Sequence, residues 1–279
     1  MADIREVYAS DYRKLALFLS HFEGDTNTPD YWLEKFYHWW DNNPAFSSDT
    51  VRGWVLEDEV SIIGFLGNIP SLFHLPVEKK DIVVFSSTTW RVLSEYRNKS
   101  MALLDNQLRF SRNSILFNST PTETVRVILE RLQFKHYEVS SGIGNSLLNP
   151  GKVLSEKMKK NVMKKLLLGL CFPALKIWQW LDTMSCSLAK TPPNVAELEK
   201  ADKSFDTLWS KTKSLFSAGV RSAEVVNWFC FGNRNARKYL FGYYENELLL
   251  GYAIFYPSRA DNLAISSALT YGRCRARKG

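Results

Sequence analysis

The sequence is poor in cysteine, with only four in 279 residues. None of the four belongs to a C-x-x-C pair or has a histidine at zinc spacing, which argues against a structural metal and a disulfide framework. Such cysteines are typical of buried residues in a reducing compartment. The first residues lack the apolar run of a secretory signal. We therefore expect a cytoplasmic protein without a bound metal.

The sequence also lacks any nucleic-acid-binding motif, although its formal net charge is +7. Its basic residues are dispersed apart from one segment, so we expect no nucleic-acid partner. The charge remains compatible with a phosphate-bearing ligand or an acidic membrane surface. What the chain has in abundance is aromatic side chains, at 14% of its residues, and these need large buried surfaces.

The first 150 residues alternate between strand and helix patterns. A short strand at Ile4–Val7 precedes a helix over 12–20 and an aromatic helix that begins after Thr28-Pro29 and ends at Pro44. Strands follow at 53–56, 60–66 and 81–92. Then come a helix over 97–110, a strand at 115–117, a helix from Pro121 to Leu132 and a last strand at 135–140. The order predicts a mixed α/β sheet.

This order resembles the fold of the GNAT superfamily of N-acetyltransferases, and three local patterns agree with it. Ile4-Arg5 with Ser10-Asp11 resembles the start of the family's domain. The segment 92–102, VLSEYRNKSMA, resembles its acetyl-CoA motif, V-x-P-x-Y-R-x-x-G-x-G/A. Residues 129–137 resemble its closing helix and strand. The resemblance covers about residues 1–145 and implies an acyl-CoA N-acyltransferase domain.

In the acetyl-CoA segment a strand leads into a helix, whose first turn has unpaired N–H groups suited to an anion. The resemblance implies that the CoA pyrophosphate binds there and that the pantetheine arm lies along the strand end. Ser100 stands where the family has its central glycine, and a serine hydroxyl can still donate to phosphate. A plain amphipathic helix with a basic first turn is the alternative. The predicted binding residues are Trp90, Val92, Arg97, Asn98, Lys99, Ser100, Met101 and Ala102.

Three ionisable residues are candidates for acid–base chemistry. Many family members place a tyrosine on the last helix as the acid for the leaving thiolate, and here that position is Leu129. We take Tyr137, His74 and Asp81 as candidates, because they are ionisable groups in plausible elements. Each has an ordinary structural alternative, and positioning the amine against the thioester supplies much of such a reaction.

A second stretch repeats the first domain's central hairpin. Residues 239–255 read as strand, acidic turn and strand, like residues 53–67, and both stretches follow a Trp-containing helix and an asparagine. We interpret 195–279 as the front half of a second GNAT-like unit without a phosphate loop. Two unrelated hairpins are the alternative. In known families, tandem domains of this kind point to an amine on a sugar or peptide precursor as the acceptor.

Residues 151–194 form a basic connector. Lysines at 157–165 precede an apolar run at 166–175 that is too short to cross a bilayer, and Trp178 and Trp180 follow. A basic helix with tryptophans could lie on an anionic membrane, so we consider peripheral contact through 157–180 at the inner membrane face. A helix packed between domains is the alternative.

Together these patterns predict a GNAT-like domain at 1–150, a connector at 151–194 and a partial second unit at 195–279. The expected activity is transfer of an acyl group, with acetyl favoured, from acetyl-CoA as co-substrate to a primary amine of a small molecule, sugar or peptide. A non-catalytic GNAT-like binding module and an aminoacyl-tRNA-dependent transferase are the alternatives.

Overall fold

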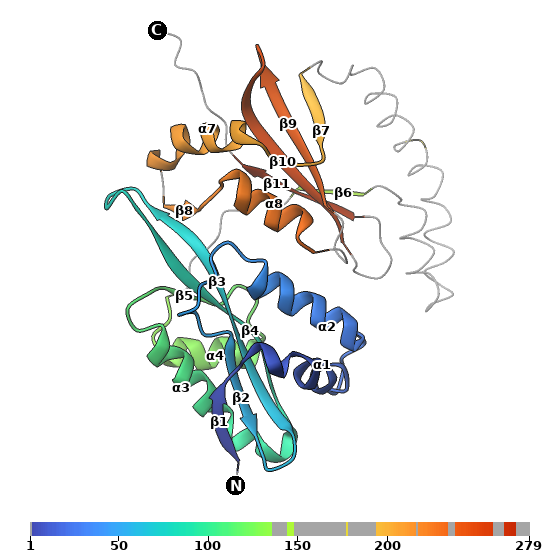
Figure 1. Cartoon of the computed structure of the whole chain (residues 1–279), viewed down its shortest axis with the longest axis vertical. Coiled ribbons are helices and arrows are strands. Elements are labelled where there is room, and N and C mark those ends of the chain that lie inside the picture. The colour runs from blue at the N-terminus through green and yellow to red at the C-terminus, as the bar shows by residue number, and fades with distance from the viewer. Residues whose placement is uncertain are drawn as a thin grey trace. The chain divides into compact units, whose positions relative to one another are not determined.

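The computed structural model describes residues 2–135, 144–147, 177, 194–215, 217–233, 238–258 and 265–271 (Figure 1). The chain divides into two compact units. The first comprises Met1–Ser140 with Trp209–Asn235, and the second comprises Ser141–Leu208 with Ala236–Gly279. Each unit is built on its own sheet with helices, so the predicted mixed α/β class is confirmed.

The first unit has a sheet in the order β1-β2-β3-β4-β5. Its strands are β1 (Asp3–Glu6), β2 (Gly53–Glu57), β3 (Ile62–Leu75), β4 (Lys80–Val92) and β5 (Leu116–Phe117). The pairs from β1 to β4 are antiparallel, and β4 pairs with β5 in parallel. The sheet therefore has the antiparallel front half and the parallel back half that the element order predicts.

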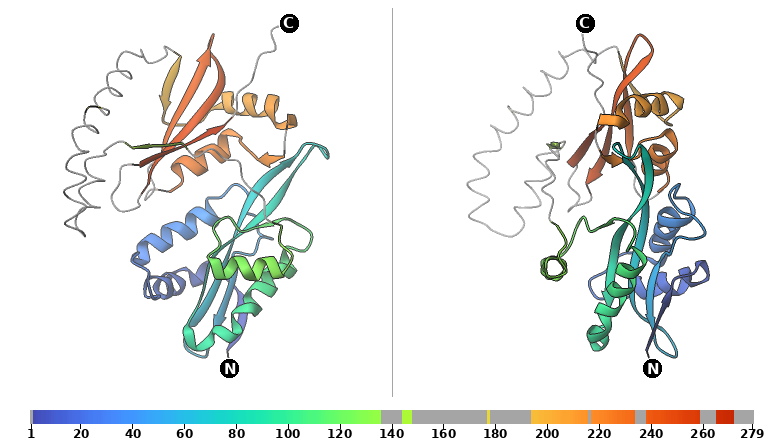
Figure 2. Two further views of the ribbon diagram at one scale, coloured as in Figure 1. Left: turned by 180° about the vertical axis from the view of Figure 1, so that it is seen from behind. Right: turned by 90° about the vertical axis from the view of Figure 1, so that its left-hand side faces the viewer.

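Helices cover both faces of this sheet, as the edge-on right-hand view of Figure 2 shows. On one face lie α1 (Tyr12–Ser20) and α2 (Pro29–Phe36), and α2 continues as a π-helical turn, η2 (Tyr37–Asp41). On the other lie α3 (Ser100–Phe110) and α4 (Glu123–Arg131). Their starts follow local chemistry, since the hydroxyls of Thr28 and Thr122 accept from backbone N–H groups three residues on.

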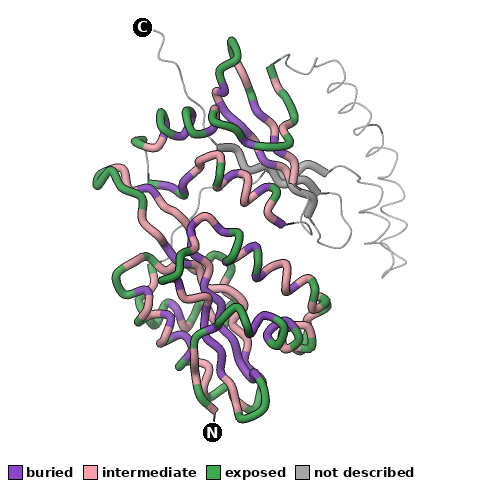
Figure 3. The backbone as a smooth tube through the Cα atoms, in the orientation of Figure 1, coloured by how far each residue is buried: buried purple, intermediate pink, exposed green. Residues whose placement is uncertain are grey.

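Each face has its own apolar core, and buried residues concentrate in the central strands (Figure 3). The rings of Trp40 and Phe36 stack in the core under α1 and α2, with 5.2 Å between their centroids. Leu103 and Leu104 anchor α3 in the opposite core. Two apolar residues of these helices, Leu17 and Met101, are 50% and 42% exposed. Both lie on the part of their helix that does not pack against the sheet.

The start of the domain is held by one arginine. The Arg5 guanidinium donates to both Asp11 carboxylate oxygens, at 2.7 and 3.0 Å, and to Glu57 Oε2 at 2.6 Å. Asp11 also accepts the Tyr8 backbone N–H. Burial opposes ionisation of Asp11, but these donors outweigh it and hold its pKa below the usual range. The Ile4-Arg5 and Ser10-Asp11 pattern therefore supplies ion pairs that join β1, β2 and the start of α1.

Strand β3 is longer than predicted, because it continues from Leu66 to Leu75. Asn68 and Pro70 interrupt the apolar pattern of the strand there. In the structure the Asn43 side chain donates to Pro70 O at 2.9 Å, and the Trp40 indole donates to Asn68 O at 2.8 Å. These distant partners satisfy the irregular positions, and the strand can continue through them.

The second unit has a sheet in the order β6-β11-β10-β9-β7. Its strands are β6 (Gly144–Leu147), β7 (Val195–Leu198), β9 (Tyr239–Glu245), β10 (Leu248–Ser258) and β11 (Ile265–Tyr271). Helices α7 (Lys203–Thr212) and α8 (Ala223–Phe231) follow β7 in the chain. Apart from a two-residue strand, β8 (Ala218–Gly219), between α7 and α8, the order β7-α7-α8-β9-β10-β11 repeats β1-α1-α2-β2-β3-β4. The predicted repeat of the first unit's strand and helix order is therefore present.

Two features of the repeat are not apparent in the sequence. Strand β6 comes from before the connector, and it pairs with β11 where β5 pairs with β4 in the first sheet. In addition, residues 209–235 group with the first unit. Strand β8 (Ala218–Gly219) pairs with β3 at Phe73 and His74, and the Trp228 indole donates to His38 O at 2.7 Å.

The proposed boundaries at 150 and 194 stay predictions. Tyr137, the strand expected at 135–140 beyond Lys135, and almost all of the connector lie outside the described residues. Among the helices that are described, none combines the length and the apolar character needed to cross a membrane.

Candidate functional site

Strand β4 has an open edge along its C-terminal half. It pairs with β5 only at Phe85↔Leu116 and Ser86↔Phe117. From Ser87 to Val92 no described strand pairs with it on that side, although β3 pairs with it on the other. An unpaired strand edge presents backbone N–H and C=O groups that can bind an extended, amide-bearing molecule.

A β-bulge distorts β4 within this open half. The register passes from Phe65↔Arg91 to Gly67↔Thr88, so Leu66 faces two residues, Thr89 and Trp90. Thr89 has a φ of 52°, a left-handed conformation that is uncommon for threonine. Bulges re-aim backbone and side-chain groups and are frequent beside active sites.

The bulge depends on a glycine in the facing strand. A Cβ atom on Gly67 would lie 2.7 Å from the Thr88 methyl carbon and 2.9 Å from the Phe65 ring. Any side chain would therefore push β3 and β4 apart at the bulge.

A buried polar network ties α3 to the bulged region. Ser87 Oγ donates to Gln107 Oε1 at 2.8 Å, and Gln107 Nε2 donates to Asn68 Oδ1 at 3.1 Å. Asn68 Nδ2 donates in turn to Val51 O at 2.9 Å. Gln107 and Asn68 are fully buried. Such a satisfied network fixes the helix relative to the strands, because each member would otherwise be an unpaired buried group.

The predicted CoA-binding residues lie at and after this end of β4. Val92 is buried in the core beside α3, and Trp90 is half-buried on the same face. Arg97, Asn98, Met101 and Ala102 are exposed, while Lys99 and Ser100 are half-buried. The Lys99 ammonium lies 3.5 Å from Ala2 O. The structure thus gathers these residues along one stretch of chain at the open strand end.

The helix expected from Arg97 begins differently. Residues Ser94–Lys99 form a 3₁₀ turn, η3, and α3 starts at Ser100. The Tyr96 N–H bonds Leu93 O at 2.9 Å, and the Ser100 N–H bonds Arg97 O. These two donors are therefore used within the turn, and fewer remain for an anion than in an open glycine loop.

On the opposite face, an ion pair joins β4 to the loop between α1 and α2. Arg91 Nη1 donates to Asp25 Oδ2 at 2.7 Å, and the guanidinium lies over the rings of Phe22 and Trp32 at 5.2 and 5.7 Å. The Asp25 side chain is only 2% exposed. Burial raises the pKa of Asp25, but hydrogen bonds from Asn27 and Arg91 outweigh it and the pKa is lowered overall.

This pair predicts a pH-dependent stability. A carboxyl whose folded pKa is lowered stabilises the fold above its unfolded pKa of about 3.9, and this is lost as the pH falls through the folded pKa. We expect Asp25→Asn to lower the free energy of unfolding by roughly 2 kcal/mol at pH 7, less than for a fully buried pair because Arg91 is partly exposed. Urea unfolding at pH 7 and pH 3 measures it. The gap between wild type and variant should shrink at pH 3, and the exposed Asp49→Asn should show no gap at either pH.

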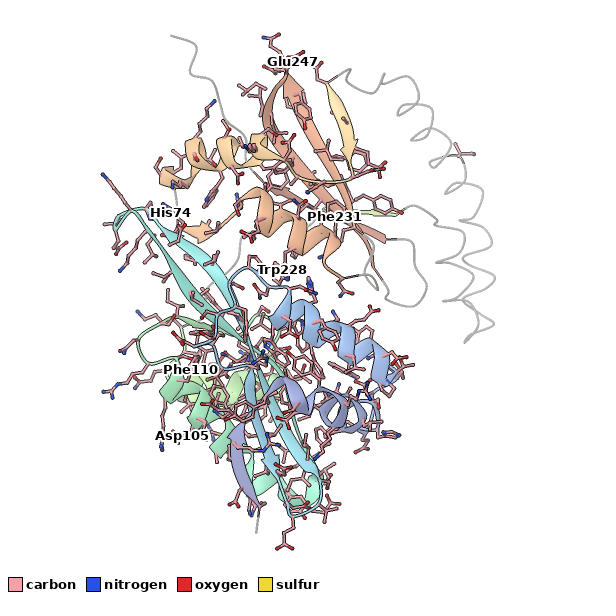
Figure 4. The ribbon with its side chains drawn as sticks, viewed as in Figure 1. His74, Asp105, Phe110, Trp228, Phe231 and Glu247 are labelled. Atoms are coloured by element: carbon pink, nitrogen blue, oxygen red, sulfur yellow. The ribbon has the colours of Figure 1, made fainter. Side chains whose placement is uncertain are left out.

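Two catalytic candidates, His74 and Asp81, face each other across β3 and β4. His74 Nδ1 donates to Asp81 Oδ1 at 2.6 Å, and the buried imidazole meets the edge of Trp209 at 5.9 Å. Figure 4 shows His74 near the tip of the β3–β4 hairpin. Asp81 is nine residues from Trp90 along β4, roughly 30 Å at the rise of an extended strand. A thioester at the bulge would therefore lie out of contact with this pair, and a catalytic role for His74 and Asp81 stays a prediction.

Two further expectations from the sequence concern the acid on the last helix and a bound metal. Leu129, which lies on α4 at the family's tyrosine position, is buried, with 6% of its surface exposed. The described residues contain no group of three or more metal-ligating side chains.

No protein-family model matches the sequence, and no curated protein sequence matches it. The structure is similar to glucosamine-6-phosphate N-acetyltransferase from Arabidopsis thaliana, with a TM-score of 0.38 and 15% identity over 50% of this chain and 95% of that one. An acetyltransferase of Trypanosoma brucei has a TM-score of 0.38 and 16% identity over 52% of this chain and 99% of its own.

A third similar structure is that of N-myristoyltransferase of Saccharomyces cerevisiae with bound myristoyl-CoA. It has a TM-score of 0.47 and 10% identity and covers 97% of this chain, which spans 61% of that protein. All three are acyltransferases by name.

Proposed function

We propose that the first unit is an N-acyltransferase, which moves an acyl group, with acetyl favoured, from CoA to a primary amine of a small molecule, sugar or peptide. The observation that carries this proposal is the open, bulged half of β4, which leads directly into η3 and α3. A strand edge for amides followed by a helix start for phosphate matches the order of groups along CoA.

The pantetheine arm of CoA is extended and contains two amides. Such a molecule can add to the edge of β4 as a further strand would, with hydrogen bonds between its amides and the backbone. The pyrophosphate would then reach the start of α3, where the helix dipole and the side chains of Arg97, Lys99 and Ser100 favour an anion.

The reaction itself needs an amine nitrogen placed against the thioester carbonyl carbon. The nitrogen forms the new C–N bond, the C–S bond breaks, and the thiolate takes a proton that the amine releases. Holding the two groups in a reactive geometry supplies much of the rate. Tyr137 remains the candidate acid for the thiolate.

Reversing the charge at η3 tests the phosphate site. We expect the double variant Arg97→Glu, Lys99→Glu to weaken CoA binding at least tenfold, because a phosphate contact becomes a repulsion. Isothermal titration calorimetry with CoA measures the change. The matched control is Arg112→Glu, an exposed arginine just beyond the other end of α3. Equal affinity in the double variant and the control would contradict the site.

A non-catalytic binding module is the second candidate. The 3₁₀ turn uses N–H groups near the expected phosphate, and Leu129 removes the family's acid. Thermal shifts with acetyl-CoA, longer acyl-CoAs and free CoA separate the two candidates, since a ligand specific to the native state raises the melting point. A shift without turnover on any amine supports the module, and a shift only with aminoacyl-tRNA supports that donor instead.

The cytoplasmic location and the peripheral membrane contact through 157–180 are part of the proposal. The basic residues and tryptophans of that segment support the contact. Flotation of the full chain with anionic and neutral vesicles tests it.

A further inference from the structure

Two tryptophans of the first unit bury an indole N–H without a partner. Trp90 Nε1 and Trp32 Nε1 are both shielded from solvent, and neither has a hydrogen-bond partner among the described residues. Most buried donors in proteins are paired, because an unpaired one costs free energy. Each such group therefore calls for an explanation.

The two indoles lie on opposite faces of the sheet. Trp32 is on α2, within the aromatic core with Phe36 and Trp39. Trp90 belongs to the bulge itself and packs with the core under α3. Only Trp90 therefore combines an unpaired donor with the open strand edge and the face on which α3 begins.

The chemistry of the indole restricts what it can bind. Its N–H donates and never accepts, so the partner must be an acceptor such as a carbonyl oxygen. A neutral donor in an apolar surrounding suits an amide carbonyl. In the proposed orientation of CoA, the amides of the pantetheine arm lie along this part of β4.

We propose that the Trp90 indole N–H donates to an amide carbonyl of the pantetheine arm and so selects ligands that have this arm. The inference rests on the proposed function, because it assumes that CoA lies along the open half of β4. It adds a side-chain contact to the backbone contacts of the strand edge. Because the Trp90 indole N–H is shielded from solvent in the free protein, this hydrogen bond requires a local movement of the side chain or of the groups that cover it when the ligand binds.

The test compares Trp90→Phe with the matched variant Trp32→Phe in the full chain. Both substitutions keep an aromatic ring and remove one unpaired indole N–H. We expect Trp90→Phe to weaken CoA and acetyl-CoA binding about 3- to 10-fold, the value of a single hydrogen bond. Its affinity for adenosine 3′,5′-bisphosphate, which lacks the arm, should stay unchanged. Trp32→Phe should leave both affinities unchanged.

A direct measurement complements the affinities. In ¹⁵N-labelled protein, the indole resonance missing from Trp90→Phe identifies Trp90, and it should move downfield when CoA is added, while that of Trp32 should not. The variants serve only to assign the two resonances, and the shift itself is measured on the wild-type protein.

The possible outcomes distinguish failure of the Trp90 contact from failure of the proposed function. If wild type binds CoA and Trp90→Phe binds it equally well, the contact is refuted and the proposed function stands. If Trp90→Phe loses the same factor for adenosine 3′,5′-bisphosphate, the residue only supports the fold of the site, and the contact is again refuted. If wild type binds no CoA, the proposed function itself fails.

Discussion

The variant Trp228→Ala should lower the free energy of unfolding of the first unit by about 3 kcal/mol, the range for removing a well-packed tryptophan. Its indole stacks on His38 at 4.8 Å and donates to His38 O, a contact between residues 190 positions apart in the sequence. The variant would lose both the ring contact and the hydrogen bond to His38 O. Denaturant unfolding of the full chain, followed by the fluorescence of the remaining tryptophans, measures the loss.

The same helix provides the control for this prediction. Phe231 lies one turn further along α8 and is 39% exposed, and both residues are labelled in Figure 4. We expect Phe231→Ala to cost less than about 1 kcal/mol, as for a surface aromatic. Equal losses in the two variants would show that α8 as a whole, rather than the Trp228 contact, sets the stability.

The second large effect concerns the buried amide between α3 and the strands. Gln107→Leu keeps the volume but leaves Ser87 Oγ and Asn68 Oδ1 without the partners described above. One buried and one half-buried polar group left without these partners should together cost about 3 kcal/mol in the free energy of unfolding. Because the network adjoins the bulge, CoA binding should weaken as well. Unfolding curves and calorimetry on the same samples measure both effects.

Asn106 offers the matched control on α3. Its side chain donates to Ala102 O at 2.8 Å, within the same helix. Asn106→Leu should change the free energy of unfolding by less than about 0.5 kcal/mol. A loss as large as that of Gln107→Leu would indicate that substitution in α3, and not the network, is responsible. If Gln107→Leu were as stable as wild type, the network would have no stabilising role.

Local patterns in the sequence predict most of the first unit's elements. The apolar spacing of α1 and α3, the Thr28-Pro29 start of α2 and the strand β4 depend on neighbours within a few residues, and the structure agrees with them. The extension of β3 through Asn68 and Pro70 depends on Trp40 and Asn43, far away in the chain. A pattern read along one strand contains no signal for such partners.

The sequence predicts where along the chain the candidate site lies, but it does not predict the geometry of the site. The motif at 92–102 locates the strand end and the start of α3, but the 3₁₀ turn, the bulge at Thr89 and the short pairing with β5 follow from three-dimensional packing. Two of the catalytic candidates, His74 and Asp81, lie on β3 and β4 at the end of this strand pair that is remote from the bulge. The assignment of Trp228 to the second repeat missed its contact with His38, because the two are distant in the sequence.

Both compact units are assembled from separate stretches of the chain, and this has a consequence for folding kinetics. Strand β6 pairs with β11, and β3 pairs with β8, so neither sheet is complete until a strand far along the chain is in place. Contacts of such long sequence separation form slowly, because a large loop must close before they form. A ribosome that has made the first sheet's own strands has not yet made residues 209–233. The first unit should therefore finish folding late in synthesis, and refolding from denaturant should be slow and sensitive to protein concentration.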